Sequence, residues 1–90
     1  MTNHTYDNNS RIATLQEAKA FIRHVVFDLG WIEFHPDDSF ASFRCFPSDK
    51  VSLYDRLKAE SFEACRAAGA DIYQMGITEI RNYMVKHKIK

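Results

Sequence analysis

Apolar side chains recur at helical spacing along much of the chain, and residues 14–29 show this pattern most clearly. Thr14 and Glu17 have the spacing of a capping box, in which each side chain accepts a hydrogen bond from the other residue's backbone N–H. Gly30 stands where a helix commonly ends in the left-handed conformation. A helix over 14–29 would gather on one face Leu15, Ala18, Ile22, Val25, Val26 and Leu29.

A second helix is predicted for residues 50–68. Ser48 or Ser52 can cap its start, and Gly69 can end it. Ser61 falls in the middle of the apolar face, where a small side chain permits close helix packing if its hydroxyl bonds back to a carbonyl oxygen. The other members of that face are Tyr54, Leu57, Cys65 and Ala68.

A third helical region covers about residues 71–86. Asp71 is a candidate cap for a first short piece, and Thr78 for a second. Gly76 would cost about 1 kcal/mol relative to alanine inside a helix, so we expect a break or bend there. The side chains expected to point inward are Ile80, Tyr83 and Met84.

The segment 31–46 connects the first two helices and is rich in aromatic residues. One structure for it is a β-hairpin, with strands at 31–34 and 40–46 joined across the tetrapeptide HPDD. The other is an irregular segment with a short helix, in which Pro36 takes the first position and Asp37 and Asp38 complement the helix dipole. We favour the second structure, because a hairpin of this length is only marginally stable by itself.

The composition indicates one small globular domain. The chain has 90 residues, of which 46% are hydrophobic and 13% aromatic, and this suffices for a thin core. We therefore predict a mainly α fold, a small three-helix domain over residues 12–90 with the aromatic-rich connector packed across it. The polar residues 1–11 are expected to form a flexible N-terminal arm.

No apolar run approaches the roughly 20 residues of a membrane span, and the polar N-terminus lacks the apolar core of a secretion signal. The expected location is the cytoplasm, where Cys45 and Cys65 would be reduced and buried rather than joined in a disulfide. Twelve basic and twelve acidic residues give a net charge of zero. Hence no overall field attracts nucleic acid or a membrane, and little charge opposes self-association.

His35, Asp37 and Asp38 are candidate ligands for a divalent metal, and His24 and Asp28 can add to them from the first helix. Helix-start and turn chemistry explains the first three residues more simply, so we expect no metal and no other cofactor. The sequence also lacks the motifs of phosphate-binding loops, dinucleotide-binding folds and serine hydrolases. We therefore do not expect an enzyme.

Without the motifs of an enzyme, a binding function remains, and we first expect the chain to bind a protein partner. Phe27 lies off the apolar face of the first helix, so either another segment, such as the connector, covers it or it is an exposed anchor. With Trp31, and with Tyr6 in the arm, Phe27 is a candidate site for a protein partner or a second copy of the chain.

Binding of nucleic acid is the alternative function. Residues 80–90 contain no acidic residue, and their cations can contact phosphate groups. The segment 62–83 has some likeness to a helix-turn-helix, with Gly69 at the turn, but Gly76 would then fall inside the recognition helix. Dipole complementation at a helix end also accounts for these cations, which are Arg81, Lys86, Lys88 and Lys90.

Two stretches, LGWIEFHPDDSFASF and ESFEACRAAGADIYQ, carry a resemblance to a protein family. Together they resemble small uncharacterised bacterial proteins of mobile-element or phage type, which share an FHPD…F segment and a helix that ends in G-x-DIY. The resemblance covers residues 29–75, about half of the chain, and the basic C-terminal end lies outside it. It implies a bacterial, cytoplasmic accessory protein and no particular activity.

Overall fold

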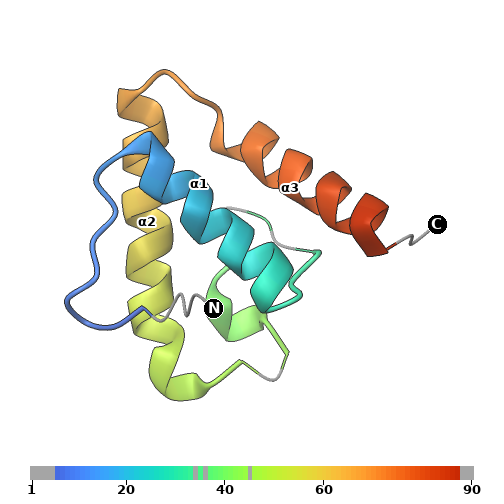
Figure 1. Ribbon diagram of the computed structural model, residues 1–90. Helices are drawn as coiled ribbons and strands as arrows, with labels where there is room; N and C mark the ends of the chain where they lie inside the picture. Colours follow the sequence, from blue (N-terminus) through green and yellow to red (C-terminus); the bar gives the residue numbers. More distant parts are fainter. Residues whose placement is uncertain (1–5, 34, 36, 45, 88–90) are drawn as a thin grey trace.

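The computed structural model describes residues 6–33, 35, 37–44 and 46–87. Within these ranges the chain is mainly helical and has no β-strand, which confirms the predicted fold class. In chain order the elements are α1 (Leu15–Arg23), the π-helical turn η1 (His24–Asp28), the 3-10 turns η2 (Phe40–Ser42) and η3 (Ser48–Lys50), α2 (Val51–Ala67) and α3 (Ile72–His87). Figure 1 shows α1 packed across α2, while α3 leaves the end of α2 and runs past α1.

The start of α1 is the predicted capping box. The Thr14 hydroxyl accepts from the Glu17 N–H at 3.1 Å, and Glu17 accepts from the N–H groups of Ala13 and Thr14 at 2.7 and 3.1 Å. These backbone donors lower the pKa of Glu17, because they stabilise its carboxylate. At its other end the helix widens into η1, where the Leu29 N–H reaches back to the His24 carbonyl, and Gly30 follows at φ +76°.

Helix α2 begins without the predicted serine cap. The turn η3 runs directly into it, and neither Ser48 nor Ser52 makes a side-chain capping bond. Further along, the Ser61 hydroxyl donates to the Leu57 carbonyl at 2.9 Å, which confirms that this buried hydroxyl is satisfied within the helix. The helix ends as expected at Gly69, which has φ +73°.

Helix α3 is continuous, so the predicted break at Gly76 is wrong. Asp71 does cap the start, accepting from the Tyr73 N–H at 3.0 Å, but Thr78 donates to the Gln74 carbonyl and caps nothing. Gly76 is buried on the face of α3 that meets the rest of the domain. Burial against neighbouring elements thus outweighs the propensity cost of a glycine inside the helix.

The connector is irregular in its described part, as favoured, and no hairpin forms there. Its helical turn is η2, however, which begins at Phe40. Asp37 and Asp38 therefore lie before the turn, and Ser39 caps it by accepting from the Ala41 N–H at 3.1 Å. Phe34, Pro36 and Cys45 fall outside the described residues.

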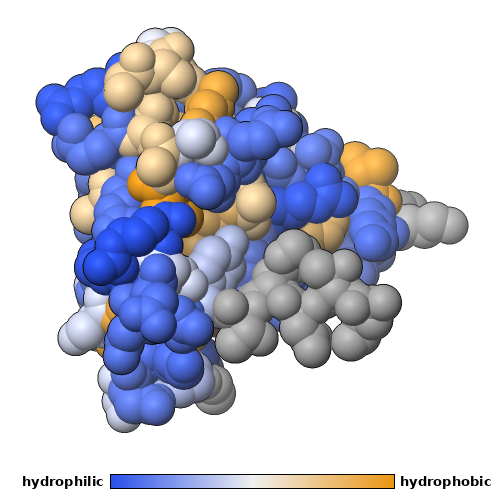
Figure 2. All heavy atoms as spheres, turned by 60° about the vertical axis from the view of Figure 1, so that its left-hand side comes forward, coloured by the Kyte–Doolittle hydropathy of each residue, from blue (hydrophilic) through white to orange (hydrophobic). Residues whose placement is uncertain are grey.

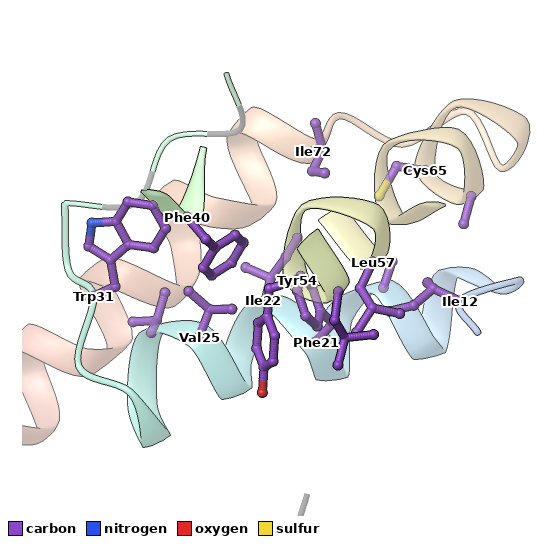
Figure 3. Packing of buried hydrophobic residues seen from close by; sticks show 14 residues of the cluster. Ile12, Phe21, Ile22, Val25, Trp31, Phe40, Tyr54, Leu57, Cys65 and Ile72 are labelled. Atoms are coloured by element: carbon purple, nitrogen blue, oxygen red, sulfur yellow. The ribbon is translucent and has the colours of Figure 1, made fainter. Parts of the chain in front are cut away.

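The core lies where α1, α2 and the connector meet (Figure 3). Phe40 stands at its centre, fully buried, with Trp31 and Tyr54 edge-on to it at ring distances of 5.0 and 5.2 Å. The free thiol of Cys65 is also buried, as predicted, and this burial raises its pKa. The aromatic connector therefore fills the interior that three helices alone would leave thin.

Within the segment 1–11, which we predicted as a flexible arm, Tyr6 and Ser10 are half-buried. A turn forms where the Ser10 N–H donates to the Asp7 carbonyl at 2.9 Å, and Tyr6 packs edge-on to Phe21 with ring centres 5.4 Å apart. The Arg56 guanidinium on α2 donates to the Asn8 carbonyl at 3.3 Å. Residues 1–5 lie outside the described part of the chain.

Hydrophilic side chains cover most of the face shown in Figure 2, and hydrophobic ones form small groups between them. Among the described residues, no helix is both long enough and apolar enough to cross a membrane.

Candidate functional site

A chain of three polar side chains links η1 to α2. His24 is only 9% exposed, and its Nδ1 lies 2.8 Å from the Asp28 carboxylate while its Nε2 lies 2.9 Å from the Tyr54 hydroxyl. Because a carboxylate accepts hydrogen bonds, Nδ1–H donates to Asp28, and Nε2 of the neutral ring accepts from Tyr54. The sequence offered His24 and Asp28 as further candidate metal ligands, and in the structure they bond to each other.

This arrangement resembles the base of a hydrolase, but its hydroxyl is not available as a nucleophile. Tyr54 is 7% exposed, and its pKa is raised, first by burial and then by nearby Tyr6 and Asp28. A nucleophile must be open to its substrate, and the burial of Tyr54 denies it this approach. The chain of hydrogen bonds therefore serves to join two elements through a satisfied buried histidine.

A pocket of about 180 Å³ lies beside His24 on the outer side of α1 and η1. This is smaller than the roughly 300–1,000 Å³ of typical small-molecule sites. Its lining consists of Ala20, Arg23, His24, Phe27 and Asp28. The pocket is thus smaller than a typical small-molecule site.

Phe27 is half-buried, and among the described residues it is α3 that packs over it. The ring of Tyr83 meets it edge-on at 5.6 Å, the Arg23 guanidinium lies 4.7 Å from its centre, and the Lys86 amine lies 5.8 Å away. Cations placed over an aromatic ring make favourable contacts of the cation–π type. Phe27 therefore works mainly as the point where α3 docks on η1.

The other two predicted partner-binding residues also face inward. Trp31 is 6% exposed and stacks on Phe43 with ring centres 4.6 Å apart. Tyr6 is half-buried against Phe21, His24 and Tyr54. Phe27, Trp31 and Tyr6 are thus parts of the core or its margin, and they do not form one exposed patch.

His35 and Asp37 lie close together, but their contacts are those of a turn. The Asp37 N–H donates to His35 Nδ1 at 3.2 Å, and the Asp37 carboxylate accepts from the Tyr73 hydroxyl at 3.0 Å. Asp38 uses its backbone carbonyl, which accepts from the Lys58 amine at 2.8 Å. Among the described residues, no group of three acidic, histidine or cysteine side chains is placed to hold a metal ion.

The largest exposed apolar side chains of the described chain all belong to α3. Tyr73 and Met84 are each 36% exposed, Ile77 is 45% exposed and Val85 is 78% exposed. Met84 was predicted to point inward, but only Ile80 and Tyr83 of that trio pack against the core. We name the row formed by Tyr73, Ile77, Ile80 and Met84 the α3 stripe.

The spacing of the α3 stripe is present in the sequence, although we did not single it out. Steps of four, three and four residues place its members on one side of a helix. The predicted break at Gly76 hid the row, because it would have separated Tyr73 from the other three. A helix read as continuous from Ile72 would have revealed it.

The cations predicted for nucleic-acid binding lie partly within the described chain. Arg81 is exposed on α3, and Lys86 is exposed while its amine reaches over Phe27. Lys88 and Lys90 lie outside the described residues. The last turns of α3 thus present positive charge beside the α3 stripe.

Comparison with protein families, with curated proteins and with solved structures finds no match for this chain. The resemblance to bacterial mobile-element proteins therefore stays a prediction.

Proposed function

We propose that this protein is a non-enzymatic accessory protein that acts by binding another polypeptide along the α3 stripe. The observation that carries the proposal is the gathering of the large exposed apolar side chains of the described chain on one helix. A contiguous group of exposed apolar side chains on a small domain is a common mark of a protein-binding surface.

The geometry of α3 supports this role. The helix is anchored on one side through Tyr83, which packs on Phe27, and through buried Ile72 and Gly76. The α3 stripe therefore lies on a helix that is already anchored. Binding a partner there should cost little conformational entropy. A helix with apolar side chains at steps of four and three can pack against a partner helix in the manner of a coiled coil.

The buried polar chain supports the absence of catalysis in this proposal. Both ring nitrogens of His24 are engaged, and the tyrosine hydroxyl that it meets is buried. A general base acts on a group that a substrate can reach, and the hydroxyl beside His24 is buried.

Photo-crosslinking in the cells of origin tests the proposal. A photoreactive amino acid replaces Ile77 in one version of the full chain and Asn82, exposed on the opposite side of α3, in a matched control. We expect a protein adduct at position 77, whether with another protein or with a second copy, and none above background at position 82. An excess of wild-type chain should compete with the adduct, and an excess of the Ile77→Glu variant should not.

Equal labelling at the two positions, or none at position 77, would contradict binding through the α3 stripe.

Binding of nucleic acid through the basic end of α3 is the second candidate. It is supported by exposed Arg81 and by the lack of any acidic residue in the sequence after Glu79. A gel shift at low salt tests it, because reversing the charge of Lys86 and Lys88 should abolish nucleic-acid binding.

A further inference from the structure

The α3 stripe has the seam pattern of a two-helix pairing. Tyr73, Ile77, Ile80 and Met84 follow one another at steps of four, three and four residues, which is the alternation of the two apolar positions in a heptad. All four lie within one uninterrupted helix of 16 residues. A straight partner helix can therefore contact the whole row.

The two ends of α3 carry opposite charge. At the N-terminal end, Asp71 caps the helix, and the Asp37 carboxylate, 67% exposed, is held there by the Tyr73 hydroxyl. At the C-terminal end, Arg81 and Lys86 are exposed, and no acidic residue follows Glu79 in the sequence. A surface with this polarity complements a copy of itself turned end for end.

We propose that the polypeptide bound along the α3 stripe is a second copy of this chain, paired through α3 in an antiparallel, two-fold symmetric dimer. This inference rests on the proposed function. In such a dimer the acidic end of each α3 lies beside the basic end of the other. The dipoles of the two helices point in opposite directions, and this arrangement is also electrostatically favourable. The axis falls near the middle of the stripe, so Tyr73 meets Met84 of the second copy and Ile77 meets Ile80.

Charge favours this pairing over a parallel one. A parallel pair would bring the two basic ends together and separate them from the acidic ends, which costs free energy through like-charge repulsion. The whole chain has a net charge of zero, so no overall repulsion opposes association of two copies. The interface is confined to one helix face, and small interfaces of this kind give weak, concentration-dependent dimers.

Analytical ultracentrifugation of the full chain tests self-pairing at protein concentrations from about 1 µM to about 1 mM. This range spans the dissociation constants of weak interfaces. We expect the wild type to pass from monomer to dimer, and added salt to weaken the dimer by screening the paired ends. Ile77→Glu should raise the dissociation constant about tenfold or more, since it places two carboxylates in the seam. Asn82→Glu adds the same charge to the opposite side and should change it less than about twofold.

Mixing isotope-labelled and unlabelled wild-type chains determines whether the two α3 helices of the dimer are antiparallel or parallel. Nuclear Overhauser contacts between the two species should connect the Met84 methyl group with the Tyr73 ring. Contacts of Tyr73 with Tyr73 of the second copy would instead indicate a parallel pair and overturn the proposal. Circular dichroism of Ile77→Glu checks that this variant folds, which its exposure of 45% leads us to expect.

Two outcomes separate this inference from the proposed function. A wild-type chain that is monomeric at the highest concentration overturns self-pairing, and the proposed function then stands if position 77 crosslinks to a different protein. A dimer that Ile77→Glu leaves intact overturns self-pairing through α3. If the wild-type chain forms no dimer and position 77 forms no crosslink, self-pairing and the proposed function are both contradicted.

Discussion

Individual hydrogen bonds allow polar side chains such as His24 and Ser61 to be buried inside this domain. His24 is buried, and burying its ring is acceptable because each nitrogen has a partner, Asp28 on one side and Tyr54 on the other. The same rule applies to Ser61, whose hydroxyl bonds back to Leu57. Glu79 is the exception among described residues, since its buried Oε1 has no hydrogen-bond partner.

The Tyr54 hydroxyl gives the prediction at this scale. Tyr54→Phe leaves Nε2 of His24 buried without a partner, so we expect a loss of about 1–2 kcal/mol in the free energy of unfolding. Tyr73→Phe is the matched control. It removes a hydroxyl that bonds exposed Asp37, and it should cost less than about 0.5 kcal/mol. Urea unfolding at neutral pH measures both, and equal costs would show that the buried chain does not stabilise the fold.

The helices differ in how each one starts. α1 has a complete capping box, α2 grows out of a 3-10 turn with no side-chain cap, and α3 starts at Asp71. Their ends are more alike, because Gly30 and Gly69 each follow a helix with positive φ. Local sequence therefore predicted where helices end more reliably than what caps their beginnings.

Capping provides the prediction for the elements. Thr14→Ala removes the oxygen that accepts from the Glu17 N–H, so the free energy of unfolding should fall by about 1 kcal/mol. Ser48→Ala serves as the control, because Ser48 makes no capping bond and its loss should cost under about 0.5 kcal/mol. Thermal and urea unfolding compare the two variants. A larger loss for Ser48→Ala would mean that α2 is capped by this serine after all.

At the scale of the whole molecule, the polar side of α2 holds two distant segments in place. Glu60 accepts from the Ile12 N–H at 2.8 Å, and the Lys58 amine donates to the Asp38 carbonyl at 2.8 Å. Asp55 accepts from the Phe40 N–H at 2.8 Å and from the Ser39 hydroxyl at 2.7 Å. Side chains that a helical pattern places in solvent thus fasten the N-terminal segment and the connector.

Among these α2 side chains, Asp55 is the one whose removal should destabilise the whole domain. Asp55→Ala removes both bonds to the start of η2, and we expect a loss of about 2–3 kcal/mol in the free energy of unfolding. Because η2 carries Phe40 into the core against Trp31, the emission of Trp31, the one tryptophan of the sequence, should shift toward longer wavelength. Asp49→Ala, at an exposed site in η3, is the control and should leave stability and emission nearly unchanged. A stable Asp55→Ala variant with native emission would show that the aromatic packing holds η2 unaided.

The sequence by itself determined the helices, because capping residues, glycine stops and apolar periodicity act within a few residues of each other. It also predicted that the connector is irregular and that Ser61 is satisfied inside its helix. Tertiary structure decided the rest. Whether Gly76 breaks a helix, what covers Phe27, and which side chains stay exposed on α3 all depend on segments far apart in the chain. Packing against α1 and η1 overrides the local cost of Gly76, and the same packing leaves Tyr73, Ile77 and Met84 of the α3 stripe exposed.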